Sequence, residues 1–371
     1  MTRRILQFGT SRFLQAHVDL FVHEARTGGQ DVGPITVVKT TGDASRDARV
    51  GALADGYPVI IRGLEDGQPV EREIRVTSVT SALSIGRDRE AVKAAALEAD
   101  IFISNTGEAG YDIPAEDRFA GLASSETLPR SFPAKLLQLL DHRWANGARG
   151  LAVFPCELIN RNGRVLKGLL LDLARETGAA DGFIGWLAAQ PFADSLVDRI
   201  VATPLEPAGA IAEPYALWAI ETQPGLPTPV EHPQVVMTDD LEPYERLKLH
   251  ILNLGHTVLA DLWHHTGRPQ DETVKVILAD EAVRSILDRV YVDEVLPGFA
   301  ANGLGAQAEA YIATTLDRFR NPFLEHRIAD IFGNHALKVE RRIVAFKDWG
   351  RAAGATDATP MLDGVIARAR G

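Results

Sequence analysis

Residues 5–14 have the sequence ILQFGTSRFL, a short apolar run followed by a glycine-containing turn and the start of a helical pattern. An apolar strand that ends at Gly9 and passes directly into a helix is typical of dinucleotide-binding folds, in which N–H groups at the helix N-terminus face a pyrophosphate. The usual pattern has three glycines, but Ser11 stands at the second position and the third is absent. The turn indicates a cofactor site at Phe8, Gly9, Ser11 and Phe13, with a plain α/β turn as the alternative.

Apolar runs alternate with helical patterns through the first half of the chain. Strands are predicted at Ile5–Phe8, Ile35–Lys39, Ile101–Thr106 and Leu151–Glu157, and helices at Arg12–Ala25, Pro133–Ala145 and Leu166–Thr177. This alternation predicts a Rossmann-type α/β domain with a mostly parallel sheet. Tyr57–Val79 differs, because two runs flank an Asp66-Gly67 turn and predict an antiparallel hairpin, either inserted into the domain or extending its sheet.

A domain boundary is predicted near residue 240. Pro224, Pro227, Pro229 and Pro233 favour extended chain before it, and Val235–Met237 is a last predicted strand. Helical patterns then follow at Pro243–His264, Asp271–Leu278, Glu281–Val295, Ala306–Arg318 and from Phe323 into the 340s. We expect a Rossmann-type dinucleotide-binding domain over residues 1–238 and a mostly α-helical substrate domain over residues 239–371.

The composition narrows the class of protein. The chain has 371 residues, of which 46% are hydrophobic, enough for a large core. The net charge of −11 argues against nucleic acid as a partner, because phosphate binding needs a basic surface. The single cysteine, Cys156, fits a reducing cytoplasm, and we find no signal peptide and no run of about 18 apolar residues. We expect a cytoplasmic protein, a monomer or small homo-oligomer, that binds a small molecule but no nucleic acid and no membrane.

Residues 244–256 have the sequence YERLKLHILNLGH, in which Lys248, Asn253 and His256 fall within nine residues of a segment otherwise rich in Leu and Ile. On an ideal α-helix, at about 100° per residue, His256 lies about 80° and Asn253 about 140° from Lys248. One helix therefore offers an amine, an amide and an imidazole to the same cleft. The alternative is a solvated lysine, a helix-weakening asparagine and a histidine at the edge of the core.

The segment KLHILNLGH carries a K-x4-N-x2-H signature and resembles the mannitol dehydrogenase family of long-chain polyol dehydrogenases. Further segments resemble the tagaturonate reductase (altronate oxidoreductase) branch of that family, in the same order along the chain: ILQFGTSRFLQAHVD, IIRGLEDG, FISNTGEAG, FPAKLLQLL, PCELINRNG, LVDRIV, DDLEPYERLKLHILNLGH and RFRNPFLEH. The resemblance implies a Rossmann-type domain, a helical C-terminal domain and a metal-independent, NAD(P)-linked reaction.

The resemblance also implies roles for the polar residues of this segment. Lys248 corresponds to the catalytic general acid/base, and a lysine in an apolar cleft can both accept and donate a proton near neutral pH. Asn253 would donate to the reacting oxygen and His256 would orient a neighbouring hydroxyl. Glu245, one turn earlier, occupies a place linked to proton exit. We expect Gly255, beside Lys248 on the helical wheel, to leave room for substrate or nicotinamide.

One position departs from the family pattern. Mannitol dehydrogenases place a second asparagine after a Cys-Asp pair, whereas Cys156-Glu157 is followed here by Leu158. Tagaturonate reductases share this feature, which favours that branch. Without the second asparagine, either Asn253 alone stabilises the charge that develops on the substrate oxygen, or a nearby residue supplies another hydrogen-bond donor.

Cofactor contacts are also expected where two further strands end. Lys39 ends the second strand, where sites that prefer NAD often carry Asp or Glu. NAD is the expected cofactor, with NADP as the alternative. Lys39 would then hold the additional phosphate of NADP, or it is a solvated strand-end lysine. Asn105, Thr106 and Glu108 follow the strand that begins at Ile101.

The segment RFRNPFLEH supplies candidate substrate contacts. A uronate carboxylate suits an arginine fork, so Arg318 or Arg320 is expected to bind it, and His326 to contact sugar hydroxyls.

No metal site is predicted at His256, Asp261, His264 and His265, because they lack the i, i+4 histidine pair of a zinc-binding helix. We therefore expect an NAD(P)-dependent oxidoreductase that interconverts a keto sugar acid and its alcohol, most similar to enzymes of tagaturonate and altronate. The alternatives are fructuronate/mannonate, mannitol or arabinitol as substrate, or a non-catalytic nucleotide-binding sensor.

Overall fold

The computed structural model describes residues 3–41, 47–356 and 358–371. The chain forms two compact units. The first contains Met1–Ile61, Arg72–Ala212 and Ala216–Leu241, and the second contains Arg62–Glu71, Glu213–Tyr215 and Glu242–Gly371.

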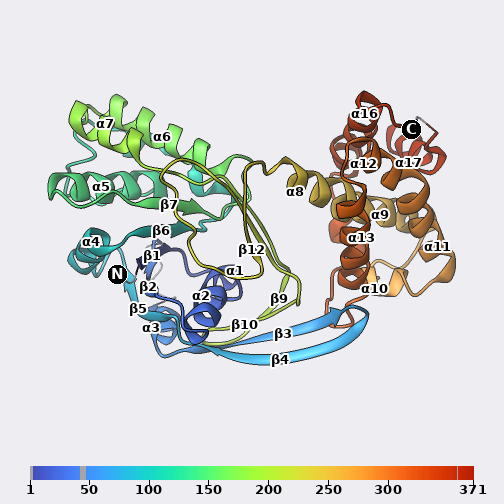
Figure 1. The fold of residues 1–371 in the computed structure, drawn as a ribbon, viewed down its shortest axis with the longest axis horizontal. Coiled ribbons are helices and arrows are strands. Elements are labelled where there is room, and N and C mark those ends of the chain that lie inside the picture. Colours follow the sequence, from blue (N-terminus) through green and yellow to red (C-terminus); the bar gives the residue numbers. More distant parts are fainter. Residues whose placement is uncertain (1–2, 42–46, 357) are drawn as a thin grey trace. The chain divides into compact units, whose positions relative to one another are not determined.

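A five-stranded parallel sheet forms the centre of the first unit (Figure 1). Its strands, in spatial order, are β5 (Val79–Ser84), β2 (Val32–Lys39), β1 (Arg3–Phe8), β6 (Ile101–Ser104) and β7 (Ala152–Pro155). The predicted Rossmann-type sheet is confirmed. The strand order reverses between β1 and β6, and in such sheets ligands bind at the carboxyl ends of the strands beside this point.

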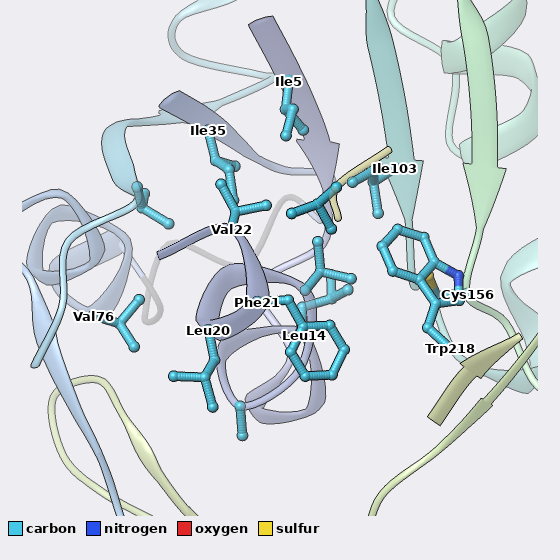
Figure 2. Close-up of a cluster of buried hydrophobic side chains, with 14 of the residues drawn as sticks. Ile5, Leu14, Leu20, Phe21, Val22, Ile35, Val76, Ile103, Cys156 and Trp218 are labelled. Atoms are coloured by element: carbon cyan, nitrogen blue, oxygen red, sulfur yellow. The ribbon is translucent and has the colours of Figure 1, made fainter. Parts of the chain in front are cut away.

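Helices cover both faces of this sheet. Successive side chains of a strand point to opposite faces, and the buried strands carry apolar residues on both of them. Ile5 and Ile103 lie in one buried cluster with Phe21 of α2, next to Trp218 and Cys156 (Figure 2). Leu6, Phe8 and Phe102 lie in a second cluster with residues of the helices on the other face. The helices of this unit are α1 (Arg12–Gln15), α2 (Val18–Thr27), α3 (Asp47–Ala54), α4 (Arg89–Glu98), α5 (Phe132–Ala145), α6 (Asn162–Glu176) and α7 (Asp181–Ala189), with 3₁₀ turns at Glu108–Tyr111 and Ala115–Asp117.

The continuous helix predicted at Arg12–Ala25 is wrong, because the chain breaks between α1 and α2. His17 has non-helical backbone angles, with φ −127° and ψ −95°. Its buried ring bonds to the Leu217 carbonyl at 3.0 Å and stacks on Phe13 with centroids 4.6 Å apart. Burial lowers the pKa of His17 to about 3, so the ring stays neutral in this position.

The predicted hairpin is confirmed, and it is an insertion. It consists of β3 (Tyr57–Glu65) and β4 (Gln68–Val76), joined by Asp66 at φ 51° and Gly67 at φ 73°, the positive angles that a tight two-residue turn requires. The two strands belong to a separate sheet, β4-β3-β10-β9, with β9 (Val201–Pro204) and β10 (Ala210–Ala212). A third sheet contains β8 (Ser195–Asp198), β11 (Leu217–Glu221) and β12 (Val235–Thr238), the strand predicted at Val235–Met237.

The second unit is mostly helical, as predicted, but three of its helices are interrupted by π-helical segments. These segments are Lys248–Asn253, Val290–Val295 and Glu340–Val344. The α-helices are α8 (Glu242–Leu247), α9 (Leu254–His265), α10 (Val274–Ile277), α11 (Glu281–Arg289), α12 (Leu296–Ala301), α13 (Gly305–Arg320), α14 (Ile328–Phe332), α15 (His335–Val339), α16 (Ala345–Ala352) and α17 (Pro360–Arg370). The helix predicted to begin at Phe323 is wrong, because α14 begins at Ile328 and the chain breaks again at Asn334, where φ is 55°.

Two short segments that precede residue 240, Arg62–Glu71 and Glu213–Tyr215, pack with the helices of the second unit. In the hairpin tip, the Gly67 N–H donates to the Asp317 carboxylate at 2.9 Å. Glu213 forms an ion pair with Arg318 at 2.8 Å, and these side chains are 1% and 3% exposed. Both segments lie within the predicted residues 1–238, yet they belong to the compact unit that holds the C-terminal helices.

Candidate active site

The segment with the K-x4-N-x2-H signature is not a regular α-helix. Lys248 begins and Asn253 ends a π-helical segment, and His256 lies in the first turn of α9. A π-turn contains an extra residue, so angles taken from an ideal α-helix do not apply across it. Lys248 and Asn253 are half-buried, and His256 is buried. Glu245 is half-buried on α8, three residues before Lys248.

The space beside Gly255 is filled by protein. A Cβ at this position would overlap the Tyr291 hydroxyl and lie 3.0 Å from the Tyr291 Cζ and 3.1 Å from a ring carbon of Phe319. The Tyr291 hydroxyl donates to the Ile251 carbonyl at 3.0 Å. The expectation that Gly255 leaves room for substrate or nicotinamide is therefore wrong, because the glycine accommodates a tyrosine of the core.

His256 lies next to one of the other predicted site residues. Its ring centroid is 4.4 Å from that of Phe319 and 5.0 Å from that of His326, which it meets edge to face. Burial lowers the pKa of His326, which favours a neutral ring. The structure thus brings together two imidazoles that are 70 residues apart in the sequence.

The two candidate arginines differ in their surroundings. The Arg318 Nε and Nη2 atoms donate to the two Glu213 carboxylate oxygens at 3.0 and 2.8 Å, and the guanidinium lies 4.4 Å from the Tyr215 ring centroid. Arg320 is exposed at the end of α13. Sequence reasoning missed Glu213, although a lone acid within the apolar run AIAEPYALW is a signal for a buried ion pair.

In the first unit, the predicted nucleotide turn meets the loop after β6. Gly9 has φ +113°, and a Cβ there would lie only 2.5 Å from the Asn105 carbonyl oxygen, so only glycine fits. The Ser11 hydroxyl caps α1 by accepting the Leu14 N–H at 3.2 Å and donates to the Asn105 side chain at 2.9 Å. The Asn105 amide donates in turn to the Cys156 carbonyl at 2.7 Å. Gly9, Ser11 and Asn105 therefore meet at the switch point between β1 and β6.

A buried carboxylate that sequence reasoning missed organises this loop. Glu157 accepts hydrogen bonds from the Ser104 hydroxyl and the Thr106 hydroxyl and N–H, each at 3.0 Å, and from the Tyr111 hydroxyl at 3.1 Å. Burial raises the pKa of Glu157, and these donors oppose that rise. The next residue, Leu158, is 65% exposed.

The remaining cofactor candidates occupy three different environments. Phe8 is buried against Phe102 and Phe132, so it would contact a cofactor through its main chain. Phe13 is half-buried against His17. Lys39 is only 3% exposed, so the alternative of a solvated lysine is wrong. The side chain of Glu108 lies outside the described residues.

Across residues 3–41, 47–356 and 358–371, no three His, Cys, Asp or Glu side chains are grouped closely enough to hold a metal ion. Within the same described ranges, every helix is too short or too polar to cross a membrane.

Family models match almost the whole chain. The Rossmann domain of mannitol dehydrogenase matches residues 3–230, and the mannitol dehydrogenase C-terminal domain matches residues 240–356. The chain belongs to the mannitol dehydrogenase family. It is therefore an oxidoreductase that acts on CH–OH groups, and the family named from the signature is confirmed.

Relatives of this mannitol dehydrogenase family member include altronate oxidoreductases. The protein of that name from Halalkalibacterium halodurans is 30% identical over 95% of this chain and 72% of its own length. The altronate oxidoreductase of Escherichia coli is also 30% identical, over 95% of this chain and 76% of its own.

Solved structures show the same fold. A D-sorbitol dehydrogenase in substrate-free form superimposes with a TM-score of 0.76 at 20% identity, covering 95% of this chain and 76% of its own. The Pseudomonas fluorescens mannitol 2-dehydrogenase, in a ternary complex with NAD and D-mannitol, gives a TM-score of 0.72 at 19% identity, covering 100% of this chain and 79% of its own. These structures support the assignment of a Rossmann-type domain followed by a helical region.

Proposed function

We propose that this enzyme interconverts tagaturonate and altronate, a keto hexuronate and its aldonate alcohol, with a nicotinamide cofactor. The observation that carries the proposal is the 30% identity to altronate oxidoreductases over 95% of the chain. Leu158 supports it, since this residue replaces the second asparagine of mannitol dehydrogenases.

Lys248 is the proposed general acid/base. In the reductive direction its ammonium gives a proton to the substrate oxygen, and in the oxidative direction the amine takes that proton back. Asn253, at the other end of the same π-segment, donates an N–H to this oxygen and stabilises its developing charge. His256 orients a neighbouring hydroxyl, and Glu245 relays the proton of Lys248 to solvent.

The bound cofactor accepts or supplies the hydride, and residues of the first unit would hold it. Gly9 permits close approach of the main chain, and Ser11 and Asn105 fix the loop at the switch point. Phe8, Phe13, Thr106 and Glu108 complete the proposed contacts. NAD is the proposed cofactor, and NADP, with Lys39 near the additional phosphate, is the alternative.

The substrate carboxylate is proposed to bind an arginine of α13. Glu213 already shares two hydrogen bonds with Arg318 and neutralises its charge. The carboxylate therefore either shares this guanidinium with Glu213 or binds Arg320. His326, beside His256, contacts the sugar hydroxyls.

The test is oxidation of NADH and NADPH with tagaturonate, fructuronate, fructose and fructose 6-phosphate. Tagaturonate should give the highest kcat/KM, and Lys248→Ala should lower kcat by at least about 10³-fold while NADH still binds, because the proton donor is lost. Lys347→Ala is the matched control, since Lys347 pairs with Asp363 on α17. Turnover of fructose above tagaturonate would contradict the substrate assignment, and full activity of Lys248→Ala would contradict the assigned base.

A further inference from the structure

Two main-chain carbonyls of the Lys248–Asn253 π-segment, those of Ile251 and Asn253, accept hydrogen bonds from side chains of the other two π-segments. The Asn253 carbonyl also accepts from the Thr257 hydroxyl at 2.9 Å. A π-turn shifts carbonyls out of the regular α-helical register, and buried carbonyls need partners. Tyr291, on the Val290–Val295 segment, donates its hydroxyl to the Ile251 carbonyl at 3.0 Å. Tyr291 is fully buried, so this bond is shielded from water.

The Glu340–Val344 segment makes a reciprocal pair of bonds to the same π-segment. The Arg342 guanidinium donates to the Asn253 carbonyl at 3.2 Å and to the Thr257 hydroxyl at 3.1 Å. The ring of His250 bonds in return to the Arg342 carbonyl at 3.0 Å. A carbonyl only accepts, so the His250 Nδ1 carries the proton. Each of the two segments thus contributes one side chain that bonds to a main-chain carbonyl of the other. We call this pair, His250 and Arg342, the clasp.

The clasp and Tyr291 contact the π-segment that joins Lys248, the proposed proton donor, to Asn253, the proposed oxyanion donor. Lys248 is the first and Asn253 the last residue of the π-segment. Arg342 holds the carbonyl of Asn253 itself, and Tyr291 holds Ile251 two residues earlier. A return of this segment to α-helical register would rotate the Lys248 and Asn253 side chains relative to each other, because an α-helical turn holds about one residue fewer than a π-helical turn and each residue then advances by a larger angle.

We propose that Arg342 and Tyr291 are positioning residues, which keep the segment in π-helical register and thereby set the relative directions of the Lys248 and Asn253 side chains. The proposal rests on the proposed roles of Lys248 and Asn253. Neither positioning residue is proposed to touch the substrate. Each acts through a main-chain carbonyl of the segment.

The expected effect is large, because misplacement of reacting groups by about 1 Å can lower a rate about 100-fold. Tyr291→Phe removes only the hydroxyl, and Arg342→Gln removes the guanidinium. Each variant should lower kcat about 10- to 100-fold, with the dissociation constant of NADH within about twofold of wild type. Arg342→Lys keeps a long, charged donor, which the shorter neutral amide of Arg342→Gln does not, and should recover part of the loss. Arg341→Gln is the matched control, since Arg341 is the exposed neighbour on the same segment.

Two readouts separate positioning from a merely structural role. The pH profile of kcat should shift in Tyr291→Phe and Arg342→Gln, because the surroundings of Lys248 change, whereas simple loss of folded protein scales the profile without moving it. In the cofactor-free protein, the pH dependence of Lys248 labelling by an amine reagent, followed by mass spectrometry, should shift in the same two variants and not in Arg341→Gln.

The labelling distinguishes failure of this inference from failure of the proposed function. If the wild-type protein turns over none of the sugars, the proposed function fails, and the labelling curve alone decides the positioning role. If the wild type is active, the kcat and pH profile of the Tyr291→Phe and Arg342→Gln variants decide whether these residues position Lys248 and Asn253. A wild-type kcat and pH profile in both Tyr291→Phe and Arg342→Gln, or a wild-type labelling curve in the inactive case, would overturn the proposal.

Discussion

Gly255→Ala should destabilise the second unit, although alanine is the better helix former. At an open helical site this change stabilises by about 1 kcal/mol. At Gly255 the new Cβ would overlap the Tyr291 hydroxyl and lie 3.0 Å from the Tyr291 Cζ and 3.1 Å from Phe319. Tyr291 is fully buried and Phe319 nearly so, which leaves neither ring a solvent-facing position to move into.

The magnitude follows from three effects. Overpacking a core position typically costs about 1–3 kcal/mol. Displacing the Tyr291 hydroxyl from the Ile251 carbonyl loses a hydrogen bond worth about 1 kcal/mol. The gain in helix propensity offsets about 1 kcal/mol of this. We expect a net loss of about 2 kcal/mol in the free energy of unfolding of the Gly255→Ala variant.

The assay is urea unfolding followed by circular dichroism, with Gly168→Ala as the matched control. Gly168 lies within α6, and a Cβ there would meet no atom within 4 Å. The control should therefore be as stable as wild type or more stable, by up to about 1 kcal/mol.

A double-mutant cycle with Tyr291→Phe identifies the cause of the Gly255 effect. Removing the hydroxyl removes the atom that the Cβ would overlap, so the double variant should be more stable than additivity predicts, by about 1 kcal/mol or more. Strict additivity, or a Gly255→Ala variant as stable as Gly168→Ala, would refute the packing argument.

Two further predictions concern buried charge and pH. Glu213→Ala should lower the free energy of unfolding by about 3–5 kcal/mol, because it leaves Arg318 buried without its carboxylate, whereas Asp330→Ala, at an exposed pair, should change it by less than about 1 kcal/mol in the same urea assay. Burial lowers the pKa of His250 from 6.5 to about 4. The unfolded chain therefore binds a proton at His250 more tightly than the folded protein does, and the free energy of unfolding should fall as pH drops from 6.5 toward 4. His250 should contribute at most about 3 kcal/mol to this fall. His250→Asn should flatten that part of the stability–pH curve, and an unchanged slope would show that His250 is not buried in neutral form.

Local patterns were sufficient to predict the main elements of both units. The apolar run before Gly9 and its repetition along the chain predicted the parallel sheet, and Asp66-Gly67 predicted the hairpin turn. These predictions succeeded because strand alternation and turn chemistry depend on neighbouring residues. The same reasoning failed at His17, where a distant carbonyl, that of Leu217, stabilises a break in the helix.

The segment with the K-x4-N-x2-H signature shows which features could be predicted from the sequence and which could not. Its spacing placed Lys248, Asn253 and His256 on one helical stretch, and that much was determined by the sequence itself. The π-helical register, the bond from Tyr291 and the clasp with Arg342 were decided by tertiary structure. Helical periodicity reports contacts three or four residues apart, whereas these partners lie 40 and 89 residues away in the chain. In this π-segment distant side chains hold the Ile251 and Asn253 carbonyls, and the pattern of neighbouring residues contains no signal for those partners.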